Sequence, residues 1–229
     1  MNKSRRSFTS RFNDFLMGLG LLSLLGFSHP STAGMTWSAR AIDPSLIGAI
    51  KHDSKLLDQT LFGDQPEIFT EKLKKEGHVD LSDKQIRDEL TAWTAKRKAE
   101  VGDTEVDLDK AWHGIHYLLT GSIESNSTLA SKVIMGGENI GPDRGYGPAQ
   151  LLNRAEVKAI AHLLEETTAD MLRQRYQPKE MTQAGVYPAV IWERDGEEAL
   201  TYVLDYYKKL VAFYKLAAEK GQAVILVIS

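Results

Sequence analysis

"AVILVI", residues 223–228, is the stretch that decides the fold, because it is an unbroken apolar run of strand length. A strand with one face in water alternates apolar and polar residues, whereas a continuous run indicates that both faces are covered. We therefore expect this segment near the middle of a sheet, with other elements packed on each side of it.

Helices and further strands are predicted upstream of this run. The longest helix covers about 196–220 and ends at Gly221. Strands are predicted at 35–43 and at 186–192, the second at a sheet edge or strand start because Pro188 has no backbone N–H to donate. The other predicted helices cover 45–50, 52–63, 83–98, 108–120, 153–176 and 177–185.

These elements predict an α/β fold class, with α+β not excluded. We expect a single compact domain in which a small mixed sheet carries several packed helices; a mostly helical domain with a minor sheet is the alternative. The charged segment at about 64–106 is expected to be a variable excursion with a solvated face. In the helix at 153–176, Asn153 and Glu156 have the spacing of a capping box. Its buried side is predicted to carry Val157, Ile160, Leu164 and Met171.

Residues 1–33 have the pattern of a secretory signal peptide. A basic start precedes an apolar run at 15–27, and small residues follow at 31–33. The run is shorter than the ~20 residues that a membrane-spanning helix needs. A pair of arginines allows a twin-arginine leader, with the Sec route as the alternative. We expect cleavage after Ala33 and a periplasmic or secreted protein; the alternative is a cytoplasmic protein whose translation starts at Met35.

The chain that remains is acidic and lacks cysteine. The full sequence has 28 basic and 31 acidic side chains, and the leader removes four and one of them, which leaves 24 and 30 and a net charge of −6. An acidic surface without a basic cluster argues against nucleic acid and anionic membranes as partners. The absence of cysteine excludes disulfides, thiolate metal sites and cysteine nucleophiles. It also excludes a lipid on cysteine, so we expect no stable membrane anchor after leader cleavage.

Five stretches, taken in order, resemble a known family. They are "GMTWSARAIDPSLI" (34–47), "DLDKAWHGIHYLLTG" (107–121), "GGENIGPDRGYGPAQLL" (136–152), "YPAVIWERDGEEAL" (187–200) and "AVILVIS" (223–229). Together they are similar to the YfbM-like family of bacterial proteins over about residues 34–229. The resemblance implies a compact α/β domain of unknown function. Members of the family usually start near the position of Met35, so residues 1–33 depart from its pattern.

The predicted helix at 108–120, with Asp107 as N-cap and Gly121 as its end, carries the first candidate site. At 100° per residue, one side forms the core face: Leu108, Trp112, Ile115 and Leu119. A second stripe, with Tyr117 beside it, is polar: Asp109, His113, His116 and Thr120.

Two interpretations of this polar stripe compete. Asp109 would orient His113 as a general base, or His113 and His116 would share a metal. Alternatively, Asp109 only complements the helix dipole and the histidines cap a packed surface. No third ligand follows at a recognised spacing, so we expect no metal and no cofactor. The catalytic candidates are therefore His113, His116, Asp109 and Tyr117.

The glycine-rich stretch 136–148 is the second candidate site. Asp143, Arg144 and Tyr146 would line a cleft and bind a ligand there. The stretch lacks the GK[ST] and strand-led GxGxxG patterns of nucleotide sites, so we favour a structural connection whose glycines supply positive φ. Gly114, inside the histidine helix, indicates a close approach by another element, and this loop is the candidate for it.

These features predict a binding or interaction module without catalysis, whose partner is a protein or a small molecule. The alternative is an enzyme or small-ligand-binding protein that uses His113, His116 and Tyr117 facing the loop at 136–148. A cavity at the stripe that Arg144 or Tyr146 also lines would favour the alternative. Burial of the histidines against apolar neighbours would count against it.

Overall fold

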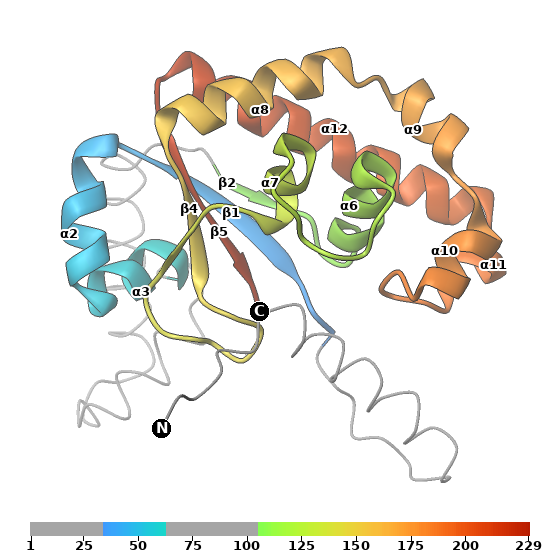
Figure 1. Ribbon diagram of the computed structural model, residues 1–229, viewed down its shortest axis with the longest axis horizontal. Helices are drawn as coiled ribbons and strands as arrows, with labels where there is room; N and C mark the ends of the chain where they lie inside the picture. The colour runs from blue at the N-terminus through green and yellow to red at the C-terminus, as the bar shows by residue number, and fades with distance from the viewer. Residues whose placement is uncertain (1–33, 63–104) are drawn as a thin grey trace, which may run out of the picture.

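The structure is a computed structural model that describes residues 34–62 and 105–229. The predicted helix at 83–98 and nearly all of the charged excursion lie outside the described residues, as does the predicted leader. The described residues form one sheet with helices on both of its faces (Figure 1). The α/β fold class, a small sheet with several packed helices in one domain, is thereby confirmed.

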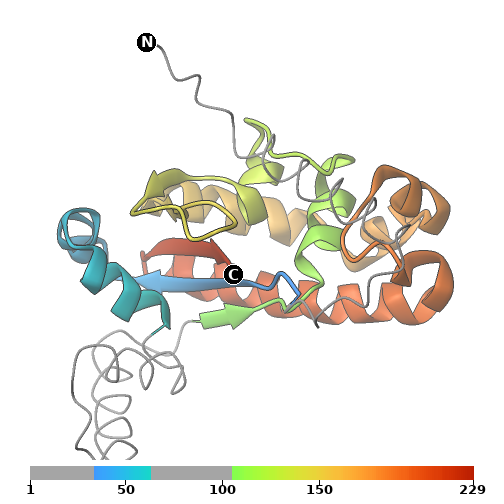
Figure 2. The ribbon, with the colours of Figure 1, turned by 90° about the horizontal axis from the view of Figure 1, so that it is seen from below.

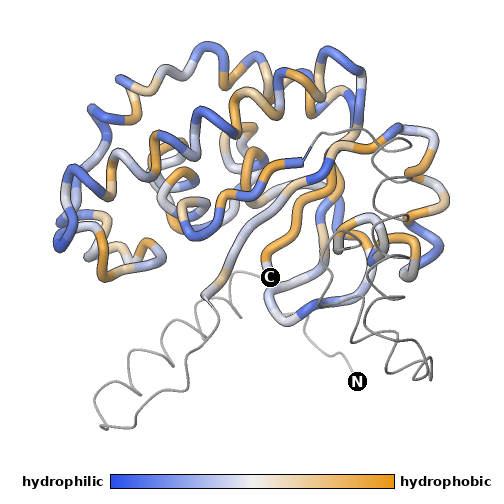
Figure 3. The backbone as a smooth tube through the Cα atoms, turned by 180° about the vertical axis from the view of Figure 1, so that it is seen from behind, coloured by the Kyte–Doolittle hydropathy of each residue, from blue (hydrophilic) through white to orange (hydrophobic). Residues whose placement is uncertain are grey.

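Within the described residues, the sheet has five strands in the order β2-β1-β5-β4-β3. They are β1 (Trp37–Ile42), β2 (Glu105–Asp107), β3 (Glu138–Ile140), β4 (Ala149–Leu152) and β5 (Ala223–Ile228). The apolar run that was expected in the middle of the sheet is β5, which pairs with β1 on one side and β4 on the other. Figure 3 shows it as a hydrophobic tube that leads to the C-terminus. The central position of this strand is therefore confirmed.

Two details of the predicted sheet are wrong. All four strand pairings are antiparallel, whereas we expected a mixed sheet. A continuous apolar run indicates that a strand is buried on both faces. It does not indicate whether the neighbouring strands are parallel or antiparallel, because both arrangements can bury the strand equally. The segment 186–192 is no strand: it leads into helix α11 (Ile191–Asp195), and the indole Nε1 of Trp192 donates a hydrogen bond of 2.7 Å to the carbonyl of Val186. Val186 and Trp192 are buried in the helical layer while Val190 is 69 % exposed. A short apolar run does not by itself distinguish a strand from another partly buried segment.

The larger face of the sheet carries most of the helices. They are α6 (Trp112–Thr120), α7 (Leu129–Met135), α8 (Arg154–Glu166), α9 (Ala169–Arg175), α10 (Pro178–Ala184), α11 and α12 (Glu197–Glu219). The 3-10 helix at Pro44–Leu46 and the helices α2 (Ile47–His52) and α3 (Ser54–Phe62) pack on the smaller face. Figure 2 shows α2 and α3 at the opposite end of the molecule from α10 and α11. Strand β5 divides its side chains accordingly, with Val224 and Leu226 in the large core and Ile225 in the small one.

The predicted helix at 153–176 is two helices. It breaks at Thr167 and Thr168, and the side chain of Thr168 caps α9 by accepting a hydrogen bond from the N–H of Met171. The break shifts the helical phase, so that Leu172 is fully buried while Met171 is 37 % exposed. The prediction that Met171 lies on the buried side is therefore wrong, whereas Val157, Ile160 and Leu164 are buried as expected.

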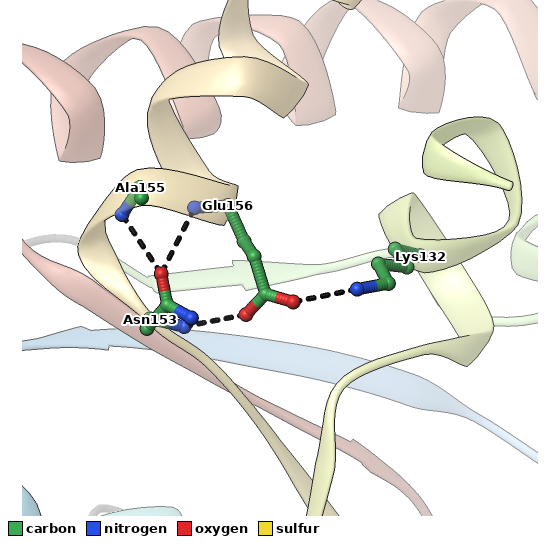
Figure 4. A network of polar contacts seen from close by, with 4 residues as sticks. All are labelled: Lys132, Asn153, Ala155 and Glu156. Atoms are coloured by element: carbon green, nitrogen blue, oxygen red, sulfur yellow. Dashed lines mark hydrogen bonds and ion pairs between the residues drawn. The ribbon is translucent and has the colours of Figure 1, made fainter. Parts of the chain in front are cut away.

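A capping box starts α8, as the sequence predicted (Figure 4). The side chain of Asn153 accepts hydrogen bonds from the N–H groups of Ala155 and Glu156, and the Glu156 carboxylate accepts one from the N–H of Asn153. The other oxygen of that carboxylate contacts Nζ of Lys132 at 2.6 Å. The box thus fixes the start of α8 and also ties it to the end of α7.

Candidate functional site

The helix that carries the two histidines begins at Trp112, four residues later than the predicted start. The Asp107 side chain accepts a hydrogen bond of 2.6 Å from the N–H of Asp109, and the backbone of Asp109 has φ +46°. A left-handed residue breaks the helical phase, so Asp109 does not share a stripe with His113. Its carboxylate accepts instead a hydrogen bond of 2.9 Å from the hydroxyl of Tyr202 on α12. The end of the helix at Gly121, with φ +71°, is as predicted.

Both histidines are fully buried and their rings are fixed by backbone groups. Nδ1 of His113 accepts a hydrogen bond of 2.9 Å from the N–H of Tyr187, so the proton is on Nε2, which donates to the carbonyl of Ile123 at 3.0 Å. In the same way, Nε2 of His116 donates to the carbonyl of Glu124 at 3.2 Å. The two imidazoles therefore link α6 to the segment that follows it, and His113 also links α6 to Tyr187.

Burial, which penalises the imidazolium, lowers the pKa of His113 and the pKa of His116 from 6.5 to about 4. The hydrogen bonds from the rings to backbone carbonyls raise the pKa of each histidine, but burial lowers it by more. Nδ1 of His116 is buried and has no hydrogen-bond partner among the described residues. At pH 7 both rings are neutral groups inside the core. One of the two interpretations of the sequence has these histidines contact a ligand. In the structure, neither of them lines either of the two cavities described below.

The glycine-rich stretch contains β3 and the hairpin loop that leads from it to β4, and its polar residues have local roles. One carboxylate oxygen of Asp143 accepts hydrogen bonds from the N–H groups of Gly145 and Gly147. The guanidinium of Arg144 contacts the carboxylate of Asp58 on α3 at 2.6 Å. Positive φ values at Gly137, Gly141, Gly145 and Gly147 confirm that the glycines serve the backbone. The structure therefore does not bring Asp143 and Arg144 to the histidines.

Tyr117 and Tyr146 are partly buried against the large core. Tyr146 lines a cavity of only about 20 Å³ beside Trp37 and Pro148. A cavity of that volume holds about one water molecule, because a water needs roughly 10–15 Å³ of accessible space. The cavity beside Tyr146 therefore has room for about one water molecule.

The close approach that Gly114 indicated is made by Trp192 and not by the glycine-rich loop. A Cβ atom on Gly114 would lie 2.5 Å from Cη2 of Trp192 and 3.2 Å from Cγ2 of Val203. The indole of Trp192 is fully buried. The glycine thus lets α11 and α12 pack directly on the histidine helix.

The larger cavity, of about 280 Å³, was not predicted. Its wall comes from the turn before α6, from α11 with the segment that precedes it, and from the start of α12: Lys110, Pro188, Ile191, Asp195, Glu198, Ala199 and Tyr202. These residues share no sequence motif, and only the tertiary fold brings the three segments together. The apolar segment 186–192, which the sequence pattern predicts to be a strand, contributes Pro188 and Ile191 to this wall and is the nearest indication of the cavity in the sequence.

Tyr202 holds one wall of the cavity in place. Its hydroxyl donates to Asp109 and accepts a hydrogen bond of 3.2 Å from the N–H of Lys110. Burial, together with the bond to Asp109, raises the pKa of Tyr202 far above its ordinary value, so the phenol stays neutral. The wall that contains Pro188 is fixed in turn by the hydrogen bond from the N–H of Tyr187 to His113.

The charged groups of this cavity differ in their partners. Asp195 binds the guanidinium of its neighbour Arg194 through both carboxylate oxygens, one of them at 2.7 Å. Asp195 does not cap the next helix, since the N-cap of α12 is Gly196. Lys110 and Glu198 are exposed, and neither forms an ion pair within residues 34–62 and 105–229.

Within residues 34–62 and 105–229, no three His, Asp or Glu side chains gather closely enough to hold a metal ion. In the same ranges no helix combines the length and the apolar character that crossing a membrane requires.

Comparison with known proteins gives three findings. Residues 34–227 match the family model described as "Domain of unknown function (DUF1877)". The chain is 28 % identical to Protein YfbM of Escherichia coli (strain K12) over 133 residues, which are 56 % of this chain and 78 % of that protein. The crystal structure of YfbM from Escherichia coli, titled a protein of unknown function, has a TM-score of 0.56 at 19 % identity and covers 85 % of this chain and 99 % of that one. The resemblance expected from the five stretches is confirmed, and the structural match supports the fold.

Proposed function

The chain belongs to the DUF1877 family, a domain of unknown function, and from this premise we propose that it is a binding module without catalysis that holds a small ligand in the cavity beside Tyr202. The cavity itself is the observation that carries the proposal. Its volume of about 280 Å³ is just below the roughly 300–1,000 Å³ of drug-sized ligand sites, which suits a small molecule. Its wall combines apolar side chains with a few polar groups, as ligand sites do.

The positions of the histidines also support a binding role. A general base must reach the proton that it removes, within hydrogen-bond distance or through one water. His113 and His116 have no exposed surface, and the described hydrogen bonds of their Nε2 atoms go to backbone carbonyls. A ligand in the cavity would meet Tyr202 and the charged residues of the rim instead.

A screen of small amphipathic compounds by ligand-observed NMR tests the proposal, with binders mapped onto backbone amide shifts. We expect shifts to gather at 188–202 and around Lys110. Ile191→Trp, which fills the cavity from a half-buried position, should abolish binding. Leu216→Trp, at a 38 % exposed position near the other end of α12, is the matched control and should bind as the unmodified protein does. Equal binding by both variants, or shifts far from the cavity, would overturn the proposal.

One observation favours the alternative, a ligand or reaction site at His113, His116 and Tyr117. The buried Nδ1 of His116 has no hydrogen-bond partner among the described residues, which is a costly state for a polar atom. A ligand donor at this atom would remove that cost. In the same screen, the alternative predicts shifts at 116–124 that His116→Gln abolishes while Ile191→Trp does not.

We also propose that the protein is exported with residues 1–33 as its leader and is periplasmic or secreted. The family match supports this boundary because it starts at Gly34, directly after the expected cleavage site. The test is the N-terminal residue of the protein made in its native host, where Gly34 supports export and Met35 contradicts it. The net charge of −6 supports the further expectation that nucleic acid is no partner.

A further inference from the structure

Two residues of opposite charge line the cavity without forming an ion pair with each other. Lys110 comes from the turn before α6, and Glu198 comes from the first turn of α12. They line the same cavity, yet they form no ion pair with each other, so Nζ of Lys110 lies more than 4.0 Å from the Glu198 carboxylate oxygens. The other charged group of the wall, Asp195, is already paired with Arg194.

The remainder of the wall is apolar or neutral. Pro188, Ile191 and Ala199 contribute carbon surface, and Tyr202 contributes a neutral phenol whose hydroxyl already has two partners. A complementary ligand therefore has a short apolar body, one ammonium group for Glu198 and one carboxylate for Lys110. The volume of about 280 Å³ limits that body to the size of a small side chain.

We propose that the ligand is a zwitterion of the α-amino acid class with a short apolar side chain, such as leucine. The inference rests on the proposed binding function and specifies the chemistry of the same cavity. A zwitterion bridges Lys110 and Glu198, which do not reach each other, and buries its side chain between Ile191 and Ala199. Compounds with only one of the two charges leave one rim residue without a partner and bind less well.

Isothermal titration calorimetry with four compounds tests this assignment. Leucine carries both charges and the apolar body, 3-methylbutylamine lacks its carboxylate, 4-methylpentanoate lacks its ammonium, and glycine lacks its side chain. We expect leucine to bind best, and the two singly charged analogues to bind about three- to fivefold less tightly, because exposed ion pairs are worth up to about that factor. Glycine should also bind less tightly, because it buries no apolar side chain. The preference for leucine over 3-methylbutylamine should disappear in Lys110→Gln, and that over 4-methylpentanoate in Glu198→Gln.

Both substitutions are at exposed positions, so the variants should fold like the unmodified protein. Lys220→Gln and Glu219→Gln, at the far end of α12, are the matched controls and should keep both preferences. Equal binding of leucine and its two analogues, or unchanged preferences in Lys110→Gln and Glu198→Gln, would overturn the zwitterion. If an uncharged compound binds the cavity while leucine does not, the zwitterion is wrong and the binding function stands. If no compound of the screen binds there, both are wrong.

Discussion

The main-chain N–H of Tyr187 donates a hydrogen bond of 2.9 Å to Nδ1 of His113, and this bond connects the buried histidine helix to the wall of the cavity. Pro188, the next residue, lines the cavity directly. The bond requires a neutral imidazole, because a proton on Nδ1 would face the N–H of Tyr187. A residue that looked catalytic in the sequence thus positions a cavity wall.

The first prediction concerns pH. Burial lowers the pKa of both histidines to about 4 in the folded chain, against 6.5 in the unfolded chain. Between these values the unfolded chain binds more protons, so the free energy of unfolding falls as the pH drops below about 6.5. Each histidine contributes at most about 3 kcal/mol to this loss, which is complete near pH 4. Urea unfolding at pH 8 and pH 5 measures it.

Two variants check the cause of that pH dependence. His116→Gln keeps a donor for the carbonyl of Glu124 and removes one titrating group, so it should reduce the loss of stability by about half. His162→Gln is the control, because the His162 side chain is 73 % exposed on α8. A slope in His116→Gln as steep as in the unmodified protein would contradict the assignment to the buried pair.

The second prediction concerns Gly114. Alanine there would place Cβ 2.5 Å from Cη2 of the buried Trp192, which cannot move without losing its hydrogen bond to Val186. Overpacking of this kind costs about 1–3 kcal/mol and outweighs the ~1 kcal/mol that alanine gains as a helix former. Gly48→Ala is the control, since nothing lies within 4 Å of a Cβ at Gly48 in α2. It should be neutral or slightly stabilising in thermal unfolding, and a destabilised Gly48→Ala with an unaffected Gly114→Ala would refute the argument.

The third prediction concerns Asp109 and its partner Tyr202. Asp109→Ala should lower the free energy of unfolding by about 2 kcal/mol, because it removes the hydrogen bond and puts alanine in a left-handed conformation. Asp109→Asn should cost much less, since asparagine tolerates that conformation and its oxygen can accept the same bond. Urea unfolding measures both, and equal losses would show that neither the conformation nor the bond matters.

The fourth prediction concerns the capping box of α8. Asn153→Ala should destabilise the protein by about 1 kcal/mol, because the N–H groups of Ala155 and Glu156 lose their acceptor. Asn153→Ser retains a capping oxygen and should lose only a few tenths of a kcal/mol. Chemical denaturation of the two variants side by side is the measurement. An equal loss in both would assign the effect to something other than capping.

Part of the site prediction succeeded because it depended on local chemistry. The burial of Trp112, Ile115 and Leu119, the end of the helix at Gly121 and the role of the loop glycines follow from short-range sequence rules, and all three are as predicted. Leu108 is buried too, but it lies before the helix. The predicted polar stripe of Asp109, His113 and His116 does not form, because Asp109 itself has a positive φ and lies before the helix. Hydrophobic periodicity does not reveal a positive φ. Aspartate does not reveal it either, since this residue is common in the first turn of a helix and also tolerates the left-handed conformation.

The sequence by itself determined the central strand, the fold class and the family, because apolar runs, caps and motif order are local properties of the chain. The antiparallel directions, the burial of His113 and the cavity beside Tyr202 were decided only by the tertiary structure. The cavity wall joins Lys110, Pro188 and Glu198 from three separate segments. Which side chains meet there depends on how α11 and α12 pack on α6, and that packing rests on the contact of Gly114 with Trp192. Such long-range contacts leave no periodic pattern in the sequence.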